Sequence, residues 1–405
     1  MIESHTNSNW RTPVIVLLAG ALVLNFSMGI RHGMGLFLFP MTADVQMSRE
    51  AFSLAMAVQN ICWGLSSPFL GMFADRYGAG RTVAFTCVLY AIGLAGMEMA
   101  TTPLLLTLSG GVLIGIAQGG CTVAVISGVI GRSVPVGQRQ QALAVSGALG
   151  ACGQFYLVPF MQWVIAGYGW QASLICSAIL MFAIAPVAVA LTEPGRPRGL
   201  AAGGQSAGAA IREALGERSF ILLCMGFFVC GIQVVFMGIH LPSYLRDQGM
   251  SANVGVIALA LIAIGNIVGT YMWGMQGARM PRRYLLSAIY FLRALVILAF
   301  IAVPISPWSV YVFSLVIGTL WLSTVPLTNG LVAHMFGVNY LSMLAGVVFL
   351  AHQVGSFLGA WMGGYLFDRT GSYTVAWLIA AGFGVFAALI HLPIREEPVG
   401  RLAVT

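Results

Sequence analysis

The stretch "GMFADRYGAGR", residues 71–81, decides how this chain folds, because it places charges between two long apolar runs. Gly71 has no side chain, so it lets two helices approach closely at this point. Asp75 stands at the expected end of a helix, and from there Arg76 and Arg81 can bridge to neighbouring helix ends. The stretch predicts a short charged turn that joins two closely packed helices.

Apolar runs continue on both sides of this turn. Hydrophobic residues make up 59% of the 405-residue chain and charged residues only 8%, which no ordinary water-soluble domain approaches. A helix that crosses the hydrocarbon core needs about 20 apolar residues, whereas a barrel strand needs only about 10. We therefore expect an all-α membrane protein with twelve transmembrane helices. The expected spans are 13–38, 51–74, 82–100, 103–131, 140–166, 171–191, 219–242, 252–275, 284–303, 307–333, 341–366 and 373–392.

The arginines predict how these spans are oriented, since the chain has no lysine. If the N-terminus is cytoplasmic, fourteen arginines lie in the termini and loops on that side. Only Arg49, Arg246 and Arg369 lie in the opposite loops. The positive-inside rule thus predicts a multi-pass protein of the cell's inner membrane with both termini in the cytoplasm. The net charge of +7 follows from this topology and predicts no nucleic-acid partner.

Several classes of protein are disfavoured by the residues that the chain lacks. All seven cysteines fall inside expected spans without a CxxC pair, so no disulfide framework, metal site or cofactor is expected. A Walker motif needs a lysine, so we expect no nucleotide site. A membrane enzyme would need clustered acids or histidines inside the spans, and a sensor would need an extra soluble domain. We expect neither an enzyme nor a sensor, and we expect a monomer.

A polar stretch divides the chain into two similar parts. It is rich in proline, glycine and charged residues, as linkers are. Six expected spans precede it and six follow it. We expect an N-terminal six-helix bundle at 1–191, a cytoplasmic linker at 192–218 and a C-terminal six-helix bundle at 219–405.

The two parts carry an internal repeat. "GIRHGMGLFLFP" at 29–40 matches "GIQVVFMGIHLP" at 231–242 with an offset of 202 residues, and Gln233 there replaces Arg31. Gly115 and Gly318 form a similar pair at an offset of 203. A constant offset near half the chain length predicts two pseudo-symmetric bundles that face each other across a cavity.

The charged turn resembles the loop signature of the major facilitator superfamily, G-x-x-x-D-R-x-G-x-R. In that family the cluster latches the cytoplasmic side while the cavity opens outward. The resemblance therefore implies a gating role for Gly71, Asp75, Arg76 and Arg81. A charged turn that only sets the topology is the alternative. The second copy, "GMQGARMPRR" at 274–283, has Ala278 in place of the acid, which argues against a symmetric latch.

Within that superfamily the chain is similar to bacterial members of the monocarboxylate-transporter type, including oxalate–formate antiporters. The stretches "GIRHGMGLFLFPM", "NICWGLSSPFLGMFADRYG" and "HQVGSFLGAWMGGYLFDRTGSY" carry the likeness. The charged positions that mammalian members have on the eighth span fall on Asn266 and Thr270 here. On the eleventh span, the lysine of the oxalate–formate exchangers falls near His352 and Gln353. The counter-charge for an anion must therefore come from elsewhere.

Arg31 is the expected counter-ion. It lies too deep in the first span to be a surface charge, and because an arginine there costs about 2.5–3.5 kcal/mol, it should face the bundle or water. Its planar fork can hold a carboxylate through two parallel hydrogen bonds at any relevant pH. The alternative is a structural arginine bound to backbone carbonyls or a helix C-terminus. For Arg293, the other deep charge, we expect a structural or snorkelling role, because its span is peripheral in the family.

Neutral polar side chains on other spans could complete a substrate site around Arg31. Each of them alone more often makes an interhelical hydrogen bond. Gln233 ranks high because symmetry places it opposite Arg31, and His352 ranks with it because of its place beside the family's cation position. Trp63 lies near two of the candidates. The expected substrate-binding residues are Arg31, Ser27, His32, Gln59, Asn60, Gln118, Gln154, Tyr156, Gln233, Asn266, Asn329, His352 and Gln353.

Together these features predict a secondary transporter that moves a small organic anion, with a monocarboxylate as the favoured substrate, by alternating access. Coupling to protons could use a histidine, since no acid lies deep in the spans, or the substrate could carry the proton itself. Exchange of one anion for another needs no titrating group. The alternative function is an exporter of hydrophobic compounds or drugs, but the fourth-span arginine common in proton-coupled drug exporters is absent.

Overall fold

The computed structural model describes residues 12–121, 123–135, 139–192, 207–337 and 341–399. These residues form helices joined by turns and short loops, and no strand occurs among them. All twelve expected spans are helical within this part of the chain. Residues 193–206, which hold most of the expected linker, lie outside it.

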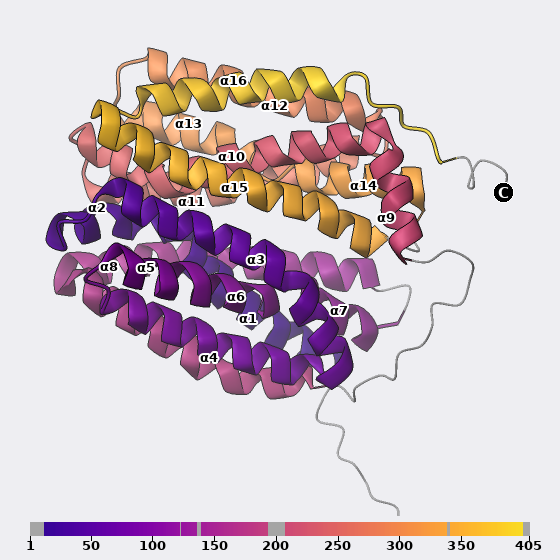
Figure 1. Ribbon diagram of the computed structural model, residues 1–405, viewed down its shortest axis with the longest axis horizontal. Coiled ribbons are helices and arrows are strands. Elements are labelled where there is room, and N and C mark those ends of the chain that lie inside the picture. Colours follow the sequence, from indigo (N-terminus) through magenta and orange to yellow (C-terminus); the bar gives the residue numbers. More distant parts are fainter. Residues whose placement is uncertain (1–11, 122, 136–138, 193–206, 338–340, 400–405) are drawn as a thin grey trace, which may run out of the picture.

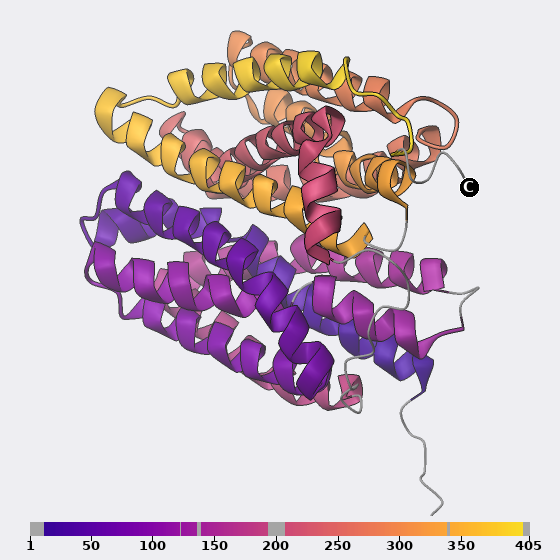
Figure 2. The same ribbon diagram turned by 45° about the vertical axis from the view of Figure 1, so that its right-hand side comes forward.

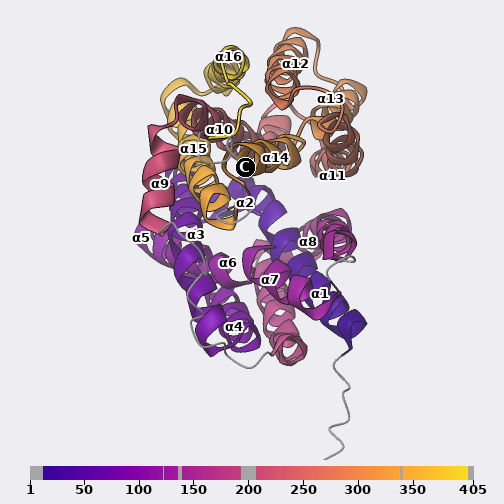
Figure 3. The same cartoon turned by 90° about the vertical axis from the view of Figure 1, so that its right-hand side faces the viewer.

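The helices fall into two groups that follow the order of the chain (Figure 1). Seen along the helices in Figure 3, the two groups lie on opposite sides of the molecule. The first group comprises α1 (Pro13–His32), α2 (Gly35–Asp44), α3 (Arg49–Tyr77), α4 (Ala79–Glu98), α5 (Pro103–Leu106), the π-helix η1 (Thr107–Leu113), α6 (Ile114–Gly120), α7 (Val123–Ser133), α8 (Arg139–Ile184) and the 3-10 helix η3 (Ala185–Leu191). The second comprises α9 (Ala207–Gly216), α10 (Arg218–Asp247), α11 (Ala252–Gln276), α12 (Arg282–Ala302), α13 (Pro307–Thr319), α14 (Thr324–Phe336), α15 (Leu341–Thr370) and α16 (Thr374–His391).

Ten helical segments of the described chain are long and apolar enough to cross a membrane. One of these, Cys152–Leu191, holds two of the expected spans, which are separated by a kink at Gly169, where φ is +88°. The remaining expected span is α3, whose mean hydropathy is lowered by Gln59 and Asn60 near its middle. Ten segments therefore account for eleven spans, and α3 is the twelfth.

Three expected spans are interrupted rather than continuous. The first is interrupted at Gly33 between α1 and α2, the fourth at Cys121 between α6 and α7, and the tenth at 320–323 between α13 and α14. An interruption within a membrane leaves main-chain groups without helical partners, and these groups need other hydrogen bonds. Asn266 on α11 supplies one of them, because its Oδ1 accepts the main-chain N–H of Leu322 at 3.0 Å.

The internal repeat is confirmed by the way in which the helices pack. A Cβ atom on Gly115 would lie 2.5 Å from the main-chain oxygen of Gln59, and one on Gly318 would lie 2.6 Å from that of Ile262. Gly115 and Gln59 are each 203 residues before their counterparts. The second and fourth spans of each half therefore cross in the same way at the same place.

The two halves are joined by polar contacts at the end where α3 begins, which we call the Arg49 end. Arg49 donates from Nη1 and Nη2 to the two carboxylate oxygens of Asp247 at 2.5 and 2.7 Å, and from Nη1 to the Tyr373 hydroxyl at 3.1 Å. The main-chain N–H of Glu50 donates to Asp368 at 2.7 Å. Figures 1 and 2 both show α3 running beside α15, which carries Asp368.

Candidate functional site

Arg31 lies in the last turn of α1, directly before the interruption at Gly33. The negative end of the helix dipole stabilises a cation at this position, by about 0.3–1 kcal/mol at an exposed site and more where water is excluded. The residue as a whole is partly buried. It does not face the hydrocarbon alone, because polar side chains of neighbouring helices surround it.

Three amide oxygens hold the Arg31 guanidinium. Nη1 donates to Gln59 Oε1 at 3.1 Å and to Gln118 Oε1 at 3.3 Å, while Nη2 donates to Asn60 Oδ1 at 2.6 Å. The amide nitrogens point away from Arg31, because Gln59 Nε2 donates to the carbonyl of Gly110 and Asn60 Nδ2 to that of Met56, both at 2.7 Å. The main chain thus orients two of the amides so that their oxygens face the cation.

Part of the donor capacity of Arg31 is unused. A guanidinium carries five N–H donors, and the three hydrogen bonds above leave Nε and one hydrogen of Nη2 without a partner among the described residues. No carboxylate of the described chain forms an ion pair with Arg31. The cation is therefore solvated by neutral dipoles and keeps its full charge available for an anion.

Aromatic side chains lie next to the Arg31 guanidinium. The ring centre of Trp63 is 4.6 Å from Arg31 Cζ, a cation–π distance. Phe349 on α15 meets Trp63 edge-on at 5.3 Å between ring centres, and it stacks on the His352 ring at 6.0 Å. Sequence reasoning missed Phe349, although it lies three residues before His352 and so on the same helix face.

A hydrogen bond joins this cluster to the second half of the molecule. Gln353 Nε2 donates to the main-chain oxygen of Asn60 at 3.0 Å. Gln353 Oε1 is 3.2 Å from His352 Nδ1, which in turn lies 3.3 Å from the Ser356 hydroxyl. We call Arg31, Gln59, Asn60, Trp63, Gln118, Phe349, His352 and Gln353 the Arg31 cluster.

Other expected site residues have different partners. Ser27 donates to the carbonyl of Cys121 at 2.9 Å, and the Nδ1 atom of His32 lies 2.7 Å from that of Met28. Gln154 donates across the two halves to the carbonyl of Leu259 at 3.1 Å. Tyr156 bonds Asn25, and Asn329 is exposed. The structure therefore does not bring these five expected residues into hydrogen-bond contact with Arg31.

Gln233 also has a different partner from the one expected. It accepts a hydrogen bond from Arg293 Nη1 at 3.3 Å and donates to the carbonyl of Ala380 at 2.9 Å, so it does not join Arg31. Arg293 is 1% exposed and donates from Nε to the carbonyl of Leu320 at 2.9 Å and from Nη2 to that of Trp321. Arg293 therefore binds main-chain carbonyls at the interruption between α13 and α14. This is the structural role expected as one alternative, and the side chain does not snorkel to the membrane surface.

The charged turn lies at the end of α3 opposite Arg49. A Cβ atom on Gly71 would meet nothing within 4 Å, so the close helix approach expected there is not present in this conformation. Arg76 and Arg81 are exposed, and Arg76 lies 5.2 Å from the ring centre of Tyr77. The side chain of Asp75 lies outside the described part.

Comparison with known proteins agrees with this architecture. The family model of the Major Facilitator Superfamily matches residues 17–360 and again 257–403. Monocarboxylate transporter 13 of Bos taurus is 24% identical over 404 residues, covering 97% of this chain and 92% of that protein. An MFS-type transporter of Bacillus subtilis (strain 168), YcxA, is 24% identical over 381 residues, covering 89% of this chain and 90% of that protein. A crystal structure of a bacterial homologue of the human lysosomal transporter Spinster, inward-facing and unoccupied, superimposes with a TM-score of 0.72 at 16% identity, over 95% and 98% of the two chains.

Proposed function

The chain belongs to the Major Facilitator Superfamily of multi-pass membrane transporters, and from this premise we propose that it carries a small organic anion, with a monocarboxylate as the favoured substrate. Relatives named as monocarboxylate transporters align with nearly the whole chain and support this substrate class. A transporter of this family acts on a small molecule, so the finer question is which residues select it.

The observation that carries the proposal is the state of Arg31. It is a partly buried cation with two unused N–H donors, and no acid of the described residues neutralises it. A carboxylate can accept both donors, and a charge-assisted hydrogen bond of this kind contributes about 1.5–3 kcal/mol. The apolar part of the substrate would lie against Trp63 and Phe349. This combination favours an amphipathic acid over the neutral hydrophobic compound of an exporter.

Transport would proceed by alternating access of two bundles, at 1–191 and 219–405, joined by the linker 192–218. Gln353 of the second half donates to the main-chain oxygen of Asn60, whose side chain holds Arg31, so the proposed site lies next to a contact between the halves. The arginine distribution supports an inner-membrane location with both termini in the cytoplasm.

Two coupling modes fit the Arg31 cluster. Among the histidines of the described chain, His352 belongs to the cluster, so it is the side chain we propose as the proton carrier in proton-linked uptake. His240 is fully buried and bonds the carbonyl of Ala360 at 2.8 Å, away from the cluster. Exchange of one anion for another would need no proton carrier.

Uptake by the reconstituted full-length protein tests the proposal. We expect liposomes that contain it to accumulate radiolabelled butyrate, and we expect Arg31→Gln to abolish uptake while the protein still inserts and unfolds cooperatively. Arg369→Gln is the matched control, because it removes a cation that lies over an aromatic ring at 4.9 Å outside the cluster. Near-normal uptake by the Arg31→Gln protein would refute the counter-ion role. A pH gradient that changes the uptake rate, and a His352→Gln protein that no longer responds to it, would distinguish proton linkage from exchange.

A further inference from the structure

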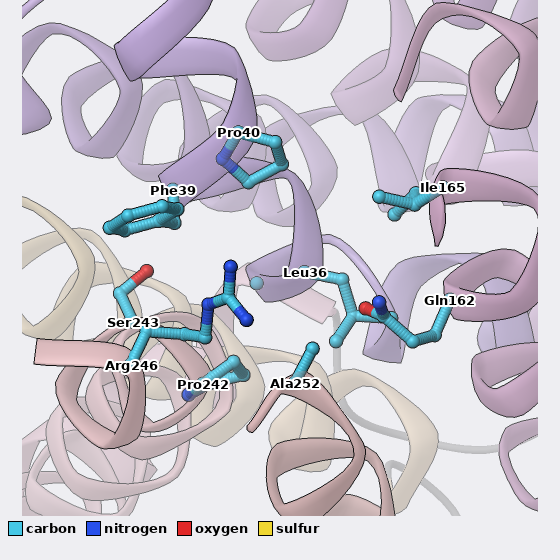
Figure 4. A pocket seen from close by; sticks show the side chains of 10 residues that line it. Leu36, Phe39, Pro40, Gln162, Ile165, Pro242, Ser243, Arg246 and Ala252 are labelled. Atoms are coloured by element: carbon cyan, nitrogen blue, oxygen red, sulfur yellow. The ribbon is translucent and has the colours of Figure 1, made fainter. Parts of the chain in front are cut away.

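A cavity lies between the two halves at the Arg49 end, and none of its lining residues belongs to the Arg31 cluster (Figure 4). Its volume is about 70 Å³, and α2 and α8 of the first half and α10 and α11 of the second half line it. Because one water needs about 10–15 Å³ of such space, the cavity can hold roughly five waters or a small organic ion. Most of the wall is apolar, including Leu36, Pro40 and Pro242.

Two polar residues of α10 line this cavity, and neither has a hydrogen-bond or ion-pair partner among the described residues. Ser243 is fully buried, and its Oγ makes no hydrogen bond within the described chain. Arg246, one turn further along the same helix face, forms no ion pair with a described acid and lies 5.2 Å from the ring centre of Phe39. Figure 4 shows its guanidinium reaching into the space, with Gln162 on the opposite wall. A buried hydroxyl without a partner costs about 1–3 kcal/mol, so it calls for an explanation.

We propose that this cavity is a binding site for a short-chain monocarboxylate. The carboxylate would accept hydrogen bonds from Arg246 and the Ser243 hydroxyl, and the alkyl chain would lie against Pro40 and Pro242. The choice of a carboxylate over another small anion rests on the proposed function, whereas the cavity and its unpartnered donors do not.

A ligand in this cavity bridges the two halves. Arg246 and Ser243 belong to the second half, and Leu36, Pro40 and Gln162 belong to the first. Because the ligand contacts both halves only while the Arg49 end is closed, its binding energy stabilises the closed state. The acid would therefore slow reopening of this end when it is present in excess there, and uptake would decline at high external concentration.

Thermal unfolding of the full-length Arg31→Gln protein tests this site apart from the transport site. We expect butyrate to raise the unfolding midpoint of this variant in a saturable way, whereas the neutral isostere butyramide does not. Adding Ser243→Ala or Arg246→Gln should weaken the apparent butyrate affinity about tenfold or more, since each removes a hydrogen bond to a charged group. Adding Arg369→Gln, a change of the same charge on a residue outside the cavity, should leave the affinity unchanged.

The outcomes separate this proposal from the proposed function. Butyrate affinity that is unchanged by both Ser243→Ala and Arg246→Gln, or butyramide that binds as tightly as butyrate, would overturn the second site. Neither result would depend on whether Arg31→Gln abolishes uptake. Ser243→Ala removes an unpartnered hydroxyl and Arg246 is exposed, so both variants should fold. In transport, the same two variants should remove the decline of uptake at high external butyrate.

Discussion

The two arginines deep in the spans differ in the groups that accept their hydrogen bonds. Arg31 is held by side-chain amides and keeps unused donors, whereas Arg293 is bound to main-chain carbonyls and is fully buried. The repeat explains the difference, because the residues 203 positions after Gln59, Asn60 and Gln118 are apolar. They are Ile262, Ala263 and Trp321. The second half therefore has no amide cradle around Gln233, and its cation lies on another helix.

Replacing an amide ligand of Arg31 with an acid should neutralise the cation from within. Asn60→Asp places a carboxylate where an oxygen now lies 2.6 Å from Nη2, so a substrate must compete with an internal ion pair. We expect the KM for butyrate uptake to rise at least about tenfold while the unfolding midpoint is kept or raised. Asn60→Ser, which stays neutral, is the control. A KM for Asn60→Asp within twofold of the Asn60→Ser value would contradict the prediction.

At the scale of helices, the sequence predicts the spans but not their interruptions. Hydropathy identifies each span because a helix in lipid must be apolar along its length. The interruption at 320–323 depends on Arg293, which supplies donors from another helix, and on Asn266, which accepts the N–H of Leu322. Such partners are brought together by packing, so the hydropathy of a span does not predict where the span is interrupted.

Glycines at helix crossings should be intolerant of even one methyl group. A Cβ atom on Gly153 would lie 1.9 Å from the main-chain oxygen of Asn25, and the equivalent distance is 1.9 Å from Gly355 to Phe228, so backbone would have to move. We expect Gly153→Ala to reduce the free energy of unfolding by about 1–3 kcal/mol. Gly238→Ala is the control, because a Cβ atom there meets nothing within 4 Å. Equal unfolding midpoints for the two variants would show that α1 and α8 are packed less closely.

The charged turn after α3 should act on the rate of transport rather than on binding. A Cβ atom on Gly71 would meet nothing within 4 Å and Arg76 is exposed in this conformation, so a latch there would have to form in the opposite state. We expect Asp75→Asn to lower the turnover number for butyrate several-fold with little change in its affinity. Turnover equal to that of the unsubstituted protein would leave the turn with a role in topology alone.

For the whole molecule, the sequence predicts two similar halves and much of the Arg31 cluster. Gln59, Asn60, Gln118, His352 and Gln353 are expected from residue type and lie in the cluster. Seven further candidates of the same chemical types lie elsewhere, because residue type does not tell which helix faces meet. Which helix faces contact each other depends on packing between spans that are more than a hundred residues apart. The hydrogen bond from Gln154 to the carbonyl of Leu259 is an example.

The Asp247 ion pair of Arg49 is another long-range contact that the sequence does not predict, because Arg49 reads as one of three arginines in outer loops. In the structure it closes the Arg49 end, with its side chain 12% exposed and that of Asp247 22% exposed. An ion pair at the open surface contributes about 0–1 kcal/mol. The Arg49–Asp247 ion pair has two hydrogen bonds and is partly buried between the halves, so it should stabilise the closed state by about 1–3 kcal/mol.

Arg49→Gln should therefore shift the population toward a state with this end open, by roughly fivefold to a hundredfold. The measurement is the labelling rate of Ile165→Cys, which lies in the cavity at this end, by a membrane-impermeant maleimide in a background without the native cysteines. Asp247→Asn should give the same acceleration, and the double variant should add little more, because each change removes the same interaction. Arg369→Gln should have no effect. Labelling that is no faster in Arg49→Gln than in Arg369→Gln would mean that the apolar contacts of the halves alone hold this end closed.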